Sequence, residues 1–210
     1  MNWLSFLFLA GLGCLAYQKT DVEDSICIVQ NITGQDSNIC SGDLEIIYPE
    51  LGNVACSIIL RCLEYQRKLS RDWGPPSVKS FQVDQRNMMY VLIMVDPDAP
   101  AGQNIPSGYW RHWLVINIGP ENLHDGTIVG TELSHYRRPN PPPGTGFHHY
   151  QFFLYEQPAN ETIFLDNEER KSNGGWNMNL FVNRYRLGSP VASTQFLMER
   201  FQNGRSSRKV

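Results

Sequence analysis

The stretch PNPPPGTGFHHYQFFLY (residues 139–155) joins a loop of prolines and glycines to an apolar run rich in β-forming residues. Proline fixes φ and glycine permits positive φ, so this composition predicts a shaped loop ahead of two adjacent histidines, His148 and His149. In an extended chain alternate residues share a face, so His148 and Tyr150 lie on one face and His149 on the other. The loop can therefore aim only one of the two histidines at a given site.

Two further apolar runs precede this one. Residues 88–95 (MMYVLIMV) end at Asp96-Pro97, and residues 110–118 (WRHWLVINI) end at Gly119-Pro120. Unbroken runs of this length and composition are typical of strands that are buried on both faces. The glycine, proline and asparagine residues between the runs favour antiparallel strands joined by loops over a βαβ arrangement.

A candidate site follows from these three strands. Asp96 lies on a proline-stiffened turn, and His112 and His148 lie near the starts of two strands, so the three side chains can meet at one rim of a sheet. Alternation places His112 on the face of Trp110, and also of Leu114 and Ile116. Each residue also has an ordinary structural role, because histidines are often buried and satisfied and an aspartate before proline often caps a turn. Asp98 is expected to have only that capping role.

The C-terminal part of the chain predicts two short helices. Residues 179–187 are followed by Gly188, a typical C-cap, and Ser189-Pro190 has the N-cap and first-turn residues of another helix extending to about residue 202. Phe196, Met198 and Phe201 would provide its packing.

The N-terminal residues 1–16 carry no charge and end in Ala16, as expected of a secretory signal peptide. A membrane anchor is the alternative, but spanning a bilayer takes about 20 apolar residues, and polar residues close this run at Gln18. We therefore expect a secreted protein or one in the lumen of the secretory pathway, with lysosomal retention as a variant of that location.

Cysteines and glycosylation sequons agree with export. Cys14 lies inside the signal, which leaves Cys27, Cys40, Cys56 and Cys62. Four cysteines allow three pairings, among which the sequence does not choose. A zinc site is disfavoured because this segment has neither a C-x-x-C pair nor a histidine. Asn31 and Asn160 begin N-x-T sequons and are candidate glycosylation sites.

The C-terminal residues 170–210 are basic, with 8 Lys or Arg against 1 acidic residue. Such an end can contact an anionic membrane or an acidic partner, or it can be a solvated helix and tail. No basic stripe is interleaved with aromatic residues, so nucleic-acid binding is not expected.

The motifs MVDPDAP (94–100), WRHWLVINI (110–118) and PPPGTGFHHYQFFLYEQ (141–157) resemble the phosphatidylethanolamine-binding protein family, which includes the Raf kinase inhibitor proteins and a carboxypeptidase inhibitor. The similarity runs from about Leu44 to about Phe201. It divides the chain into the signal peptide (1–16), a cysteine-containing extension (17–43), the family domain (44–202) and a basic tail (203–210). The resemblance implies a mainly β, antiparallel sandwich-like fold with small peripheral helices and a compact anion-binding pocket at one end.

The resemblance also implies the site. Asp96, His112 and His148 match the family's pocket residues, and Trp110, Pro142 and Tyr150 match its wall positions, so the positioned histidine is His148. This chain departs from the family at three positions: His149 replaces an arginine, Asn140 a glycine and Phe196 a tyrosine whose hydroxyl would contact the ligand. We expect Asp96 to orient and charge His112 beside a bound phosphate.

These residues predict a secreted, non-enzymatic protein that binds a phosphate-bearing head group such as that of phosphatidylethanolamine or phosphoethanolamine, without a metal or another cofactor. The family implies modulation of kinase signalling and, as an alternative, protease inhibition. A further alternative is a metal-dependent hydrolase that uses Asp96, His112 and His148 as ligands.

Overall fold

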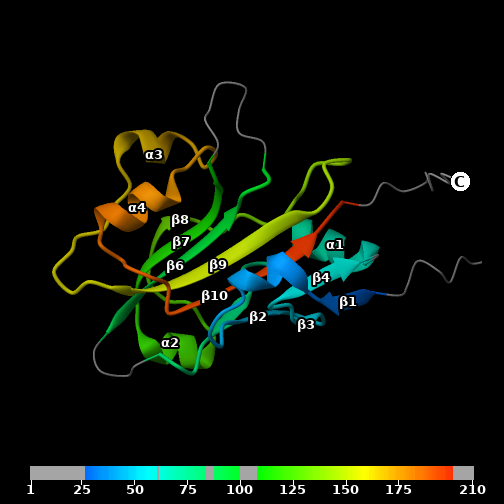
Figure 1. Cartoon of the computed structure of the whole chain (residues 1–210), viewed down its shortest axis with the longest axis horizontal. Coiled ribbons are helices and arrows are strands. Elements are labelled where there is room, and N and C mark those ends of the chain that lie inside the picture. The colour runs from blue at the N-terminus through cyan, green and yellow to red at the C-terminus, as the bar shows by residue number, and fades with distance from the viewer. Residues whose placement is uncertain (1–26, 61, 84–87, 100–107, 201–210) are drawn as a thin grey trace, which may run out of the picture.

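The computed structural model describes residues 27–60, 62–83, 88–99 and 108–200 (Figure 1). The expected signal peptide (1–16) and basic tail (203–210) lie outside the described residues. Within the part of the chain that is described, no helix has both the length and the apolar character needed to cross a bilayer.

The described residues form one seven-stranded sheet with the strand order β1-β4-β10-β9-β6-β7-β8. Its strands are β1 (Ile28–Asn31), β4 (Ser57–Leu60), β6 (Met89–Asp96), β7 (Trp110–Ile118), β8 (Thr131–Ser134), β9 (His148–Gln157) and β10 (Ala192–Met198). All neighbouring strands are antiparallel except β4 and β10, which are parallel. The sheet is therefore mixed, and the mainly β fold class expected from the sequence is confirmed.

A small second sheet and several short helices surround this sheet (Figure 1). The second sheet has the order β3-β2-β5, with β2 (Glu45–Tyr48), β3 (Gly52–Asn53) and β5 (Ser77–Lys79). The helices are η2 (Gly34–Ile39), α1 (Leu63–Arg67), η3 (Lys68–Asp72), α2 (Pro120–Asp125), α3 (Asn167–Lys171) and α4 (Met178–Arg184).

The three apolar runs form the centre of the sheet, as expected. β6 lies between β9 and β7 and is antiparallel to both. Seven of the eight residues of β6 are buried, which matches an unbroken apolar strand covered on both faces. One cluster of buried residues packs between this sheet and the small sheet, and the other packs beneath the segment that carries α3 and α4.

The expected second C-terminal helix is wrong. Residues 192–198 form β10, in which every residue is buried, and only the preceding helix exists, as α4. β10 inserts between β9 and β4 and is hydrogen-bonded to both. The Ser-Pro start signal is local, whereas a strand enclosed on both sides is stabilised by its neighbours, so the tertiary contacts override the local pattern.

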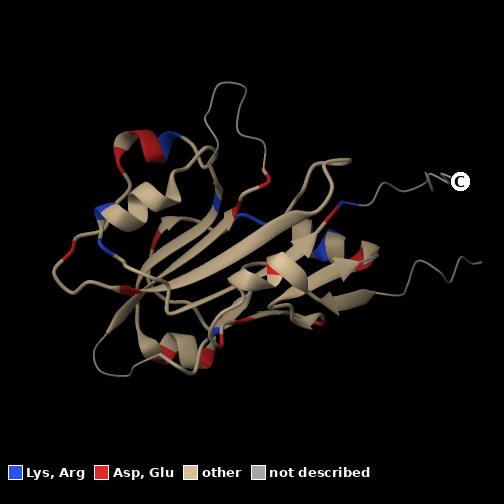
Figure 2. Ribbon diagram, in the orientation of Figure 1, with Lys and Arg blue, Asp and Glu red and all other residues tan. Residues whose placement is uncertain are grey.

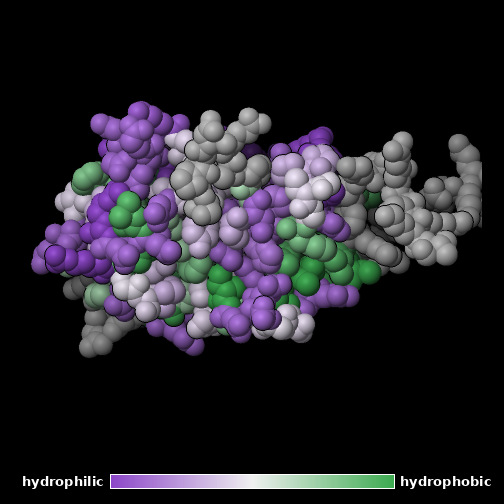
Figure 3. Space-filling model, turned by 45° about the horizontal axis from the view of Figure 1, so that its top comes forward, coloured by the Kyte–Doolittle hydropathy of each residue, from purple (hydrophilic) through white to green (hydrophobic). Residues whose placement is uncertain are grey.

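Two disulfides join Cys27 to Cys62 and Cys40 to Cys56, which selects one of the three pairings. The described part of the cysteine-containing extension is built into the sheet. β1 pairs with β4 along its whole length, and Ser41 forms a bridge with Ser193 of β10. Figure 3 shows a mainly hydrophilic face over the α3 and α4 end, with more hydrophobic residues toward the end that carries β1 and β4.

Candidate functional site

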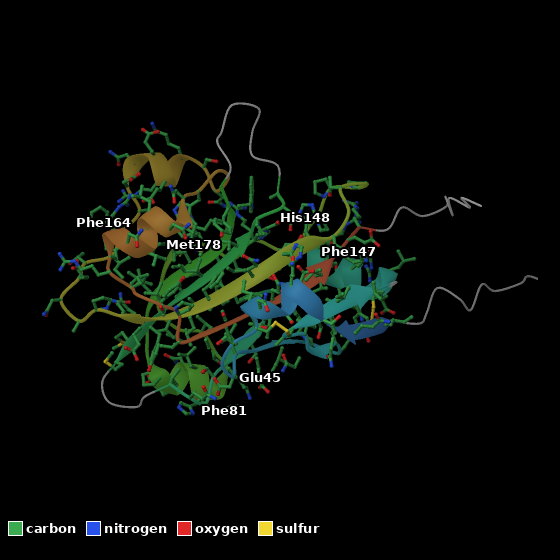
Figure 4. The ribbon with its side chains drawn as sticks, in the orientation of Figure 1. Glu45, Phe81, Phe147, His148, Phe164 and Met178 are labelled. Atoms are coloured by element: carbon green, nitrogen blue, oxygen red, sulfur yellow. A yellow bond between two sulfur atoms is a disulfide. The ribbon has the colours of Figure 1, made fainter. Side chains whose placement is uncertain are left out.

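The candidate site lies where β6 ends and β7 and β9 begin. Because β6 is antiparallel to both neighbours, these three strand ends meet at one edge of the sheet. A cavity of about 840 Å³ opens there. All six residues expected from the sequence line it: Asp96, Trp110, His112, Pro142, His148 and Tyr150. Figure 4 shows His148 at the start of β9, next to Phe147.

Asp96 and His148 form a buried pair at the inner end of the cavity. The Asp96 Oδ2 atom lies 2.7 Å from His148 Nδ1, and the two side chains are 3% and 1% exposed. The other carboxylate oxygen accepts the backbone N–H groups of Asp98 and Ala99. The proline-stiffened turn therefore caps Asp96, as expected, and fixes the carboxylate that holds His148.

The loop before β9 holds the other side of the His148 ring. Thr145 Oγ1 lies 2.8 Å from His148 Nε2 and donates to the Pro142 carbonyl, also at 2.8 Å. A hydroxyl has one proton, so when it donates to Pro142 it must accept from Nε2. The His148 ring is therefore held on both sides, by Asp96 at Nδ1 and by Thr145 at Nε2.

His112 reaches the same cavity through a β-bulge. Met94 is opposite Trp113 and Val95 is opposite Arg111, so His112 is an extra residue in the pairing of β6 with β7. Its ring contacts Tyr150, with the centroids 5.3 Å apart.

The bulge corrects the expected faces of β7. Trp110 lines the cavity with His112, as expected. Leu114 and Ile116, however, belong to the other core cluster, because the extra residue shifts the alternation. His112 and Trp113 instead contact two tyrosines of the cavity wall, Tyr150 and Tyr136 respectively.

The expected contact by which Asp96 orients His112 is also wrong. The Nδ1 atom of His112 lies 2.8 Å from the Arg137 carbonyl, whereas Asp96 is bonded to His148. A carbonyl only accepts, so Nδ1 carries the proton and Nε2 is an acceptor while the ring is neutral. Burial lowers the pKa of His112, and the Arg137 carbonyl and Asp96 charge partly oppose that shift.

The aromatic walls depend on close packing behind them. A Cβ atom on Gly174 would lie 3.1 Å from the Trp110 ring, so glycine allows the backbone to approach that ring. Tyr150 stacks on Phe196 with the centroids 5.1 Å apart. Phe196 is fully buried and is not among the residues that line the cavity. Asn140 does line the cavity.

His149 points away from the cavity. Its Nδ1 atom lies 2.7 Å from Asp98 Oδ2, and its Nε2 atom lies 3.8 Å from Asp36 of η2. Asp98 was expected only to cap the turn, but its carboxylate also contacts His149. The loop before β9 contacts His148 through Thr145.

Four basic residues of the cavity were not predicted as site residues. Arg137 and Arg138 follow β8, and Arg170 and Lys171 end α3 (Figure 2). The Arg137-Arg138 pair was visible in the sequence beside the loop, but the α3 residues gave no signal. The position of the two α3 residues depends on Arg111. Its Nη2 atom donates to the Glu169 carbonyl, and its backbone N–H donates to the Asn173 carbonyl. Burial lowers the pKa of Arg111 to about 10.

The donor atoms do not form the metal site required by the hydrolase alternative. Both oxygens of Asp96 and the Nδ1 atoms of both histidines are already used in hydrogen bonds. Among the residues that the structure describes, no three His, Cys, Asp or Glu side chains are arranged to hold a metal ion.

Most of the chain matches a known protein family. Residues 61–193 match the family model described as phosphatidylethanolamine-binding protein. The chain belongs to this family.

Three solved structures are similar to the chain. A phosphatidylethanolamine-binding protein from Plasmodium vivax is 21% identical over 80% of this chain and 90% of that one, with a TM-score of 0.55. The solution structure of CG7054 is 27% identical over 77% and 87%, with a TM-score of 0.53. A carboxypeptidase Y inhibitor, solved in complex with its cognate proteinase, is 21% identical over 75% and 83%, with a TM-score of 0.52. The first and third similarities establish the fold alone.

Proposed function

We propose that this chain is a secreted, non-enzymatic binding protein that takes a small phosphate-bearing head group into the inner site, defined as Asp96, His112 and His148. The observation that carries the proposal is the convergence of these three side chains on one cavity, with the Asp96 charge held against His148. The family to which the chain belongs is described by the binding of phosphatidylethanolamine, a phospholipid with such a head group.

The inner site can accept a phosphate without strong repulsion from its carboxylate. Two backbone N–H groups and His148 are bonded to the two oxygens of Asp96, so neither oxygen is left to face a ligand unpaired. Protonated His112 provides an N–H donor at Nε2, because its Nδ1 proton is already directed at Arg137. Charge-assisted bonds of this kind are about twice as strong as neutral ones.

Export is part of the proposal. The two disulfides are compatible with an oxidising compartment. Asn31 lies at the exposed end of β1, and Asn160 lies in an exposed turn after β9, so both sequons are accessible to glycosylation. Modulation of kinase signalling and inhibition of a protease remain secondary roles implied by the family, and the basic C-terminal end remains a proposed membrane contact.

The test is titration of the purified protein with phosphoethanolamine and with a phosphate monoester that lacks the amine, monitored by calorimetry. We expect saturable binding of the monoester at one site per chain, lost in His148→Ala and weakened in His112→Ala. Lys79→Gln, on β5 and outside the cavity lining, is the matched control and should bind normally. Binding that persists unchanged in both histidine variants would contradict the proposal.

A further inference from the structure

The cavity extends beyond the inner site to a group of cations. Its volume of about 840 Å³ is in the range of sites that enclose a drug-sized molecule. We define the basic rim as the four basic residues that line the cavity: Arg137, Arg138, Arg170 and Lys171. Among the described residues, the lining contains one carboxylate, Asp96, which is already paired with His148.

Two arginines of the basic rim, Arg138 and Arg170, are oriented by carbonyl groups, which do not neutralise their charge. Arg138 Nε donates to the Trp73 carbonyl, and Arg170 Nε donates to the Leu165 carbonyl at 2.7 Å. These neutral acceptors orient each guanidinium while its terminal N–H groups remain available. Within the described ranges, none of the three arginines has a carboxylate partner. Lys171 pairs with Glu168, but both side chains are exposed, so solvent screens that contact.

Both segments of the basic rim are fixed relative to the inner site. The Arg137 backbone N–H donates to the His112 carbonyl, and its own carbonyl receives the His112 Nδ1 proton. The segment after α3 is joined to β7 because the Arg111 backbone N–H donates to the Asn173 carbonyl at 2.8 Å. Because the backbone of both segments is already held in position, ligand binding costs little backbone conformational entropy.

We propose that the cavity takes a ligand with two anionic groups, one phosphate at the inner site and a second phosphate at the basic rim. The ligand class is a small organic bisphosphate, either free or as the head group of a phospholipid. A zwitterionic head group fits this charge pattern less well, because its ammonium would face the arginines. This inference rests on the proposed function, since the first phosphate occupies the site assigned there.

The test compares three soluble probes by calorimetry at one pH and one ionic strength: inositol bisphosphate, inositol monophosphate and phosphoethanolamine. We expect the bisphosphate to bind at least about tenfold more tightly than either monophosphate. Arg137→Gln and Arg170→Gln should each weaken bisphosphate binding by about tenfold. Arg170→Gln, whose residue has no hydrogen bond to the inner site, should leave inositol monophosphate binding within about twofold. Lys79→Gln removes the same charge from β5 and should change neither affinity.

A thermal unfolding curve for each variant distinguishes a lost contact from a lost fold. If inositol monophosphate binds at the inner site but the bisphosphate gains nothing, this inference is wrong while the proposed function stands. The inference is also wrong, with the proposed function intact, if the rim variants weaken all three probes alike. If no probe binds, or if His148→Ala binds all three normally, the proposed function is wrong and this inference with it.

Vesicles distinguish the two sources of the bisphosphate. Phosphatidylcholine vesicles are prepared with and without a phosphatidylinositol monophosphate, whose head group carries one phosphodiester and one phosphomonoester. Rim-dependent binding to the vesicles with the charged lipid, lost in Arg137→Gln, supports a lipid head group. Rim-dependent binding of soluble inositol bisphosphate without binding to vesicles supports a free ligand.

Discussion

His148 and His149 are consecutive residues, and each lies 2.7 Å from an aspartate, yet the two pairs have different surroundings. The side chains of His148 and Asp96 are 1% and 3% exposed, whereas those of His149 and Asp98 are 24% and 37% exposed. Breaking one partner of a buried pair typically costs 3–5 kcal/mol, but an exposed pair contributes about 0–1 kcal/mol. The same His–Asp contact is therefore expected to contribute more to stability on the buried side of β9 than on its exposed side.

Because consecutive residues of a strand face opposite sides, the two pairs lie on different faces of β9 and have different roles. His148 faces the cavity and connects Asp96 to the loop that forms its wall. His149 faces the opposite side, where Asp98 and Asp36 bring the turn after β6 close to η2. One pair belongs to the inner site, and the other fastens the cysteine-containing segment to the sheet.

The largest effect is expected from Asp96→Asn, which keeps the shape of the side chain and removes its charge. The buried His148 ring then loses its charged hydrogen-bond partner, so the free energy of unfolding should fall by about 3 kcal/mol. Urea denaturation of this variant and the native chain measures the difference. A loss below about 1 kcal/mol would show that the buried pair contributes no more to stability than an exposed pair.

The second prediction concerns the pH dependence of stability that arises from His112, the third histidine at this end of the sheet. Because burial lowers its pKa, the unfolded chain binds more protons than the folded chain below the ordinary value of 6.5. The contribution of His112 to stability is therefore complete above that pH and is lost as the pH falls from 6.5 toward the lowered pKa. The loss should be smaller in His112→Gln, as measured by urea denaturation across this range.

Ligand binding should respond to pH in the opposite sense. A neutral His112 presents an acceptor at Nε2, and protonation converts it into a donor to phosphate. The affinity for a phosphate monoester should therefore rise as the pH falls from about 8 to about 5. His112→Gln should flatten this profile more than His149→Gln, and a flat profile in the native chain would contradict the role of His112.

The sequence predicted those parts of the site that depend on local periodicity. Alternation along residues 147–155 separated His148 from His149. The three apolar runs located the edge of the sheet at which the candidate site lies. It did not predict that a bulge at His112 would shift the following residues, because a bulge depends on the partner strand. For the same reason the aspartate partner was assigned to the wrong histidine.

Long-range contacts explain what else the sequence predicted wrongly, left open or missed. Residues 192–198 have a helix start signal before them, but enclosure between β9 and β4 makes them a strand. The pairing of the cysteines required the position of β1 beside β4. The basic end of α3 reaches the cavity through Arg111, a buried cation inside an apolar run whose surroundings a linear pattern does not describe.

A smaller effect is expected from Asp98→Asn, the exposed counterpart of Asp96→Asn. Asparagine retains an oxygen that can accept the His149 backbone N–H, and only the charge at an exposed pair is lost. The free energy of unfolding should fall by about 0.5 kcal/mol, and added salt should reduce the difference. A loss as large as that of Asp96→Asn would show that burial does not separate the two pairs.

The smallest effect is expected from His149→Arg, which introduces the residue that the family resemblance implies at this position. Arginine remains charged at every accessible pH and can donate to Asp98 and Asp36 together, whereas histidine is a cation only when protonated. The variant should therefore gain about 0.3 kcal/mol in unfolding free energy, and added salt should reduce the gain. Monoester affinity should stay within about twofold of the native chain, since one twofold step is well below the tenfold effect of a lost charged contact. Urea denaturation with and without added salt measures the stability, and calorimetry measures the affinity. A large change in affinity without a change in stability would place His149 in the binding site and remove the distinction between the two pairs.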